Sequence, residues 1–146
     1  RKLAQNGGRA VQALFKIVDD ECGAAKSGPL NDFSERLEKA NGELKAATMW
    51  FMANGLANPN NAGAGAHHYM HIMGIVALGL MWLRMAQTAQ AAIEIGAEGK
   101  AYYETKLVTA RYYAERTMPD AGALRRKIEA GSEAMMALPP EMFAVA

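Results

Sequence analysis

Residues 69–83 read Tyr-Met-His-Ile-Met-Gly-Ile-Val-Ala-Leu-Gly-Leu-Met-Trp-Leu, and this stretch decides the fold of the chain. Its uninterrupted apolar run, residues 72–83, is flanked by His71 and Arg84. A helix that spans a membrane needs about 20 apolar residues, so this run is too short. A helix that is apolar on every side is typical of the buried centre of a bundle. We therefore expect a buried central helix from Tyr69 to Leu83 and no membrane span.

Two amphipathic helices are predicted before this central helix. Apolar residues recur at helical spacing over residues 11–22 and again over residues 33–51. Asp32 is followed three residues later by Glu35, a spacing typical of a capping box at the start of a helix.

Two more helices are predicted after it. The central helix itself should run from about residue 62 to about residue 95, where Gly96 and Gly99 interrupt the pattern. A tyrosine-rich helix follows and stops at Pro119, and a last helical stripe covers residues 124–138. Because no segment alternates with a period of two, the sequence predicts an all-α bundle of four to five helices. We expect residues 1–146 to form a single helical domain.

Composition narrows the classes of function. Of the 146 residues, 51% are hydrophobic and 21% charged, and the net charge of +1 gives no general reason to bind nucleic acid or an acidic membrane. Cys22 is the only cysteine, so no internal disulfide is possible and a reducing, cytoplasmic location is expected.

The histidines raise the question of a metal site. His67 and His71 are four residues apart, so on a helix both rings point to the same side. A protein metal site needs a third ligand and usually a fourth, and no Glu-x-x-His pair is present to supply them. We expect these histidines to line the start of a buried helix and to hold no metal. A helical metal or haem site, using the histidines and a nearby methionine, is the alternative.

Other chemistry is poorly supported. The glycine-rich residues 60–66 follow no strand and are expected to form a turn rather than a nucleotide-binding loop. No serine stands in a nucleophile-elbow context, and the carboxylates are scattered rather than paired. The ten methionines lie mostly at core spacing and are expected to fill gaps. The sequence therefore predicts no catalytic and no cofactor-binding residue.

The tyrosine-rich residues 102–119 hold four of the five tyrosines. Helical spacing assigns one side of this helix to the core and leaves the rest on another stripe. Tyrosine and arginine are enriched at the centres of protein interfaces. We therefore predict a docking stripe formed by Tyr102, Lys106, Tyr113 and Arg116. The alternative is that the rings simply lie flat over neighbouring apolar surface.

The chain resembles the C-terminal helical domain of bacterial FAD-dependent acyl-CoA dehydrogenases over nearly its whole length. The resemblance is strongest from Ala66 onward, and its opening Arg-Lys-Leu-x-x-x-Gly-Gly is similar to the junction with the catalytic body. One departure is His67-His68, where the family often has proline before the tyrosine. The other matching positions are Tyr69, Gly74, Gly79, Tyr103, Lys106, Thr109, Ala110, Arg111, Tyr113, Met118, Pro119, Gly131, Met135, Met136 and Leu138.

The resemblance implies an accessory role. The parent enzyme would use FAD to oxidise an acyl-CoA to the 2,3-enoyl-CoA, with a glutamate base in its upstream body. Nothing in this chain matches those groups, so we expect the isolated segment to bind no flavin and to catalyse nothing. It would be a C-terminal fragment that packs against the catalytic body and serves assembly of a homo-oligomer. A stand-alone helical module, binding a metal, haem or another protein, is the alternative.

Overall fold

The computed structural model describes residue 3, residues 5–55 and residues 57–144, and all regular structure in them is helical. The α-helices are α1 (Arg9–Ala25), α2 (Asn31–Trp50), α3 (Pro59–Glu94), α4 (Lys100–Arg116) and α5 (Asp120–Glu129). Short helical turns cover η1 (Gln5–Gly8), η2 (Phe51–Gly55) and η3 (Pro140–Ala144). The predicted all-α bundle is confirmed. Arg1 and Lys2 of the family-like opening lie outside the described residues.

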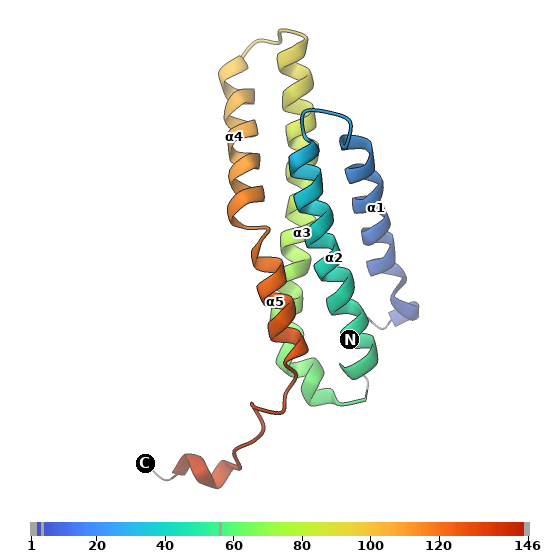
Figure 1. Cartoon of the computed structure of the whole chain (residues 1–146), viewed down its shortest axis with the longest axis vertical. Helices are drawn as coiled ribbons and strands as arrows, with labels where there is room; N and C mark the ends of the chain where they lie inside the picture. Colours follow the sequence, from blue (N-terminus) through green and yellow to red (C-terminus); the bar gives the residue numbers. More distant parts are fainter. Residues whose placement is uncertain (1–2, 4, 56, 145–146) are drawn as a thin grey trace.

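The helices pack side by side in an elongated bundle (Figure 1). Helices α1, α2 and α3 each run along its length, while α4 and α5 follow one another along successive halves of α3. The break between α4 and α5 falls at Pro119, as the sequence predicts, because proline lacks the N–H that would continue the α4 hydrogen-bond ladder.

Helix α3 is the central helix, but only one of its sides is buried. The inner side carries Tyr69, Ile72, Val76, Leu80 and Leu83, all in the core. On the opposite side Met70 is 62% exposed and Leu78 56%, and Met81 and Met85 are also exposed. The expectation of burial on every side is therefore wrong, because α1 packs mainly against α2 and no described helix covers this side. We call Met70, Leu78, Met81 and Met85 the outer stripe of α3.

Gly79 allows the close approach of neighbouring helices to the inner side of α3. A Cβ atom at this position would lie 2.7 Å from Cδ1 of Leu37 on α2 and 3.0 Å from Cε of Met118, which lies between α4 and α5. Both distances are shorter than ordinary van der Waals contact. A larger residue at this position would therefore have to displace the ends of the Leu37 and Met118 side chains.

The predicted start of the second helix needs correction. Helix α2 begins at Asn31, so Asp32 lies within the first turn and forms an ion pair with Arg36 at 2.9 Å instead of capping the helix. The Glu35 carboxylate, the other half of the predicted capping box, accepts a hydrogen bond from the Asn31 side chain.

The last predicted helix ends early. Helix α5 stops at Glu129, and Gly131 has a left-handed φ of 68°, a conformation that ends helices. Residues 132–144 then leave the bundle as a tail (Figure 1), and Met135, Met136 and Leu138 are exposed rather than aligned on a helical stripe. The predicted helix over residues 124–138 is therefore too long.

Candidate functional site

The predicted docking stripe lies on α4, and the structure divides it into two parts. Tyr102 is 62% exposed, and Nζ of Lys106 lies 5.1 Å from the centre of its ring, within the range of a cation–π contact. Arg116 is exposed in the last turn of the same helix. Tyr102, Lys106 and Arg116 therefore remain available on the surface.

Tyr113 has a role inside the chain. Its hydroxyl donates a 2.9 Å hydrogen bond to the Ile75 carbonyl of α3, and its ring centre lies 6.4 Å from that of Trp82. Burial raises the pKa of the Tyr113 hydroxyl to about 12. Half-buried Tyr113 therefore joins α4 to α3, which sequence spacing alone did not indicate.

A shallow groove of about 280 Å³ lies where α4 crosses the upper part of α3. Its lining includes two cations, Arg84 and Lys106, and one member of the outer stripe, Met85. The groove joins the exposed part of the docking stripe to the outer stripe of α3. Its lining residues are Arg84, Met85, Thr88, Ala89, Tyr102, Tyr103 and Lys106.

The histidines form a small cluster at the start of α3. The ring centres of His67 and His71 are 4.3 Å apart, so the i,i+4 pairing expected from their spacing is present. Burial, followed by the positive charge of Lys127, lowers the pKa of the neighbouring His68. Within the described part of the chain, no group of three or more His, Cys, Asp or Glu side chains could hold a metal ion.

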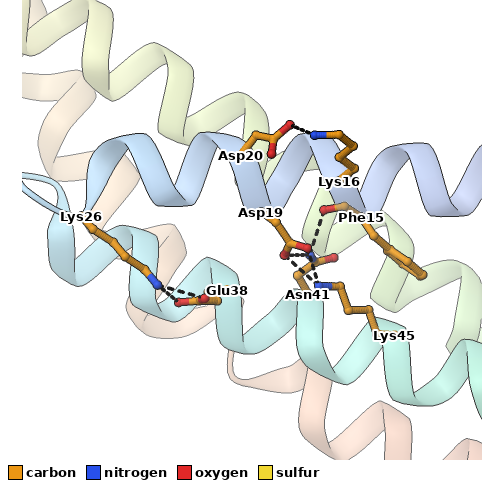
Figure 2. Close-up of polar contacts among 8 residues, drawn as sticks. All are labelled: Phe15, Lys16, Asp19, Asp20, Lys26, Glu38, Asn41 and Lys45. Atoms are coloured by element: carbon orange, nitrogen blue, oxygen red, sulfur yellow. Dashed lines mark hydrogen bonds and ion pairs between the residues drawn. The ribbon is translucent and has the colours of Figure 1, made fainter.

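A polar network between α1 and α2 was missed by the sequence analysis (Figure 2). Asn41 is fully buried, and its Nδ2 donates to Oδ1 of Asp19 at 2.9 Å and to the Phe15 carbonyl at 3.4 Å. Nζ of Lys45 reaches both carboxylate oxygens of the same Asp19, at 2.8 and 2.6 Å. This network fixes the position of α1 on α2. The signal for it in the sequence is an asparagine at a core position of α2, beside Ala40 and one turn before Leu44.

The asparagines at the start of α3 are also structural. The Asn58 side chain caps α3 by accepting a hydrogen bond from the Asn60 backbone N–H at 3.0 Å. Oδ1 of Asn61 accepts from the backbone N–H and the hydroxyl of Ser132, at 3.0 and 2.7 Å, and so holds the start of the tail. Residues 60–66, predicted to form a turn before the helix, instead lie within α3, because the Asn58 cap and Pro59 start the helix ahead of them; no strand precedes them among the described residues.

Cys22 is a core residue. It is buried on α1, and burial is the main cause that raises the pKa of its thiol to about 11. A thiol with so high a pKa is almost entirely protonated near neutral pH and is a poor nucleophile. Cys22 therefore contributes packing rather than reactivity.

The length of α3 also bears on a membrane. It is the one helix among the described residues that is long and apolar enough to cross a bilayer. The core helix of a soluble protein meets the same criteria, so this is weak evidence for a span.

The chain is a helical-bundle module. Two surface features stand out, the docking stripe on α4 and the outer stripe of α3, and they lie side by side. The family model described as "Acetyl-CoA dehydrogenase C-terminal like" matches residues 11–139. The chain belongs to this family, which makes it a C-terminal helical domain of the acyl-CoA dehydrogenase type. No curated protein matches the chain at a significant level.

Proposed function

We propose that the chain is an accessory domain of a bacterial, flavin-dependent acyl-CoA dehydrogenase and serves its packing and assembly. The observation that carries this proposal is the family match over residues 11–139. The parent would hold FAD, oxidise an acyl-CoA to the 2,3-enoyl-CoA and work in fatty acid metabolism in the cytoplasm. The chain itself would contribute no group to that reaction, and its α3 would be a core helix rather than a membrane span.

We further propose that the docking stripe of α4 contacts the catalytic body. Lys106 and Arg116 support this role, because neither has an ion-pair partner among the described residues and both can therefore meet carboxylates of another surface. Tyr102 beside them supplies a large, partly apolar contact, and Tyr113 fixes the helix that carries it.

A binding titration with a separately expressed catalytic body tests this proposal. The double variant Lys106→Glu/Arg116→Glu should weaken binding at least about tenfold while the helical content stays unchanged. The matched control is Arg9→Glu/Lys39→Glu, which changes the net charge equally at two exposed sites on α1 and α2. Equal weakening by both double variants, or by neither, would contradict a docking role for this stripe.

A further inference from the structure

The outer stripe of α3 is an apolar surface that the bundle leaves uncovered. Its four members are large and exposed, although the helix that carries them is the centre of the fold. Monomeric soluble proteins rarely expose contiguous apolar patches of more than a few hundred Å², and larger ones mark interaction sites.

Four residues along this side of α3 have a spacing that is the same in both directions, whereas Leu78 and Met85 fall outside this symmetry. Met70, Gly74, Ala77 and Met81 follow one another at steps of four, three and four, and these steps keep them on one side of the helix. Their order is large, small, small, large about a centre between Ile75 and Val76. Gly74 faces open space, since a Cβ atom there would meet no neighbouring atom within 4 Å.

We propose that the outer stripe binds a second copy of the chain, with the two α3 helices antiparallel about a two-fold axis at this centre. In such an interface, each contact between residue i and residue j occurs twice. Met70 lies opposite Met81 of the second copy, and Gly74 lies opposite Ala77. The small residues let the two helices approach closely, while the flexible methionine side chains fill the space on both sides. The proposal rests on the assembly role proposed above and gives it a surface and a symmetry.

Charge favours a second copy as the occupant. Apart from its histidines, α3 carries a single charged side chain between Pro59 and Ile93, Arg84. Its guanidinium already donates to Oε1 of Glu21 on α1, at 2.9 and 2.6 Å. Two such surfaces can therefore meet without burying an unpaired charge, which would cost several kcal/mol.

The size of the stripe sets the expected strength. From Met70 to Met85 it is about 23 Å long, and a helix side about 10 Å wide gives roughly 230 Å². A standard interface buries about 800 Å² on each partner, so flanking residues must take part. Exposed Ile17 flanks the stripe on α1, one turn from the Glu21 that binds Arg84. We expect a dissociation constant in the micromolar range, at about 1 to 100 μM.

Charge pairing across the two-fold axis gives a specific test of the register. Met70→Lys and Met81→Glu each place one charge against a methionine of the second copy, and each variant should be monomeric. An equimolar mixture of the two variants should dimerise, because the introduced lysine of one chain then meets the introduced glutamate of the other. The chain that carries both substitutions should also dimerise, through two such pairs. The measurement is sedimentation velocity at about 100 μM protein, where these dissociation constants give the unmodified chain a weight-average mass of about 1.5 to 1.9 times its 15.7 kDa.

Several outcomes would overturn the proposal. One is an unmodified chain that stays monomeric at this concentration, whether or not it binds phospholipid vesicles. Another is recovery of the dimer on mixing Met70→Lys with Met70→Glu instead of with Met81→Glu, because that result requires parallel helices. Val108→Lys, on an exposed site of α4, is the control for an added charge and should leave the dimer unchanged. The variant Lys106→Glu/Arg116→Glu should also dimerise normally, so docking to the body and pairing of α3 can fail independently.

Discussion

The inner and outer sides of α3 are both apolar and have very different surroundings. Leu83 on the inner side is 0% exposed, whereas Leu78, five residues earlier on the outer side, is 56% exposed. The outer side is rich in methionine, while the inner side carries leucine, valine, isoleucine and tyrosine, but all of these are apolar, so hydrophobicity alone cannot tell the two sides apart. Burial depends on which neighbouring helices are present, and the bundle supplies neighbours for the inner side alone.

Truncation of one leucine on each side tests this contrast most directly. Leu83→Ala should lower the free energy of unfolding by about 2 to 5 kcal/mol, because it leaves a cavity in a packed core. Leu78→Ala should change it by less than about 0.5 kcal/mol. Chemical denaturation should be measured at low protein concentration, so that association does not contribute. Equal losses of unfolding free energy for the two variants would contradict the difference in burial between the two sides of α3.

The same contrast between buried and exposed groups applies to polar links between α1 and α2. Asn41→Ala should cost about 1 to 3 kcal/mol, because the Phe15 carbonyl and Asp19 each lose a buried hydrogen-bond donor. The matched surface link is the ion pair of Lys26 with Glu38, about half exposed on both sides. Glu38→Ala should cost no more than about 1 kcal/mol. A larger loss for Glu38→Ala than for Asn41→Ala, measured by denaturant unfolding, would reverse this ranking.

Two tyrosines of α4 extend the contrast to single hydroxyl groups. Tyr113→Phe removes the hydrogen bond to the Ile75 carbonyl and should cost about 0.5 to 1.5 kcal/mol, whereas Tyr102→Phe, at an exposed site, should be neutral.

The effect of Tyr113 should depend on pH. Because its pKa is raised from 10.0 to about 12 in the folded chain, its contribution to stability is fully present below pH 10. That contribution should be lost as the pH rises from about 10 toward 12, since the unfolded chain then releases the proton first. The stability difference between the unmodified chain and Tyr113→Phe should therefore shrink over this interval. A difference that is constant from pH 9 to pH 12 would contradict burial of this hydroxyl.

The smallest expected effect concerns the start of α2. Asp32→Ala removes an exposed ion pair with Arg36 and should cost about 0.3 to 0.5 kcal/mol. A true capping residue would cost about 1 kcal/mol or more, as Asn58→Ala should at the start of α3. Thermal unfolding of the two variants would separate the roles, and equal losses would restore the capping box that the sequence predicted.

Much of the fold followed from periodicity, glycine and proline. The 33–51 stripe, the breaks at Gly96 and Gly99 and the stop at Pro119 all correspond to observed elements. The end of α5 was missed, because helical spacing beyond Gly131 continued by coincidence while the glycine itself took a left-handed conformation. The start of α2 was missed because the helix begins one residue earlier, at Asn31, which places Asp32 inside its first turn, where its carboxylate pairs with Arg36.

The candidate site was less predictable than the fold. Sequence spacing placed Tyr102, Lys106 and Arg116 on the surface, and the structure shows them there. It could not show that Tyr113 reaches the backbone of α3, since that contact depends on the crossing of two helices. The ten methionines were expected to fill core gaps, yet Met118 is the only one in the core, Met73 is partly buried and the other eight are exposed. Periodicity indicates which residues share a side of a helix but not which side is covered.

These exposed methionines make the outer side of α3 sensitive to oxidants. Thioether sulfur is converted to a sulfoxide when peroxide can reach it, and the product is polar and chiral. Met70 and Met81 would react early, whereas Met118, packed beside Gly79, would be shielded. Mild oxidation would thus turn the one uncovered apolar side of the central helix into a polar surface and leave the core untouched. Methionine sulfoxide reductases would restore it.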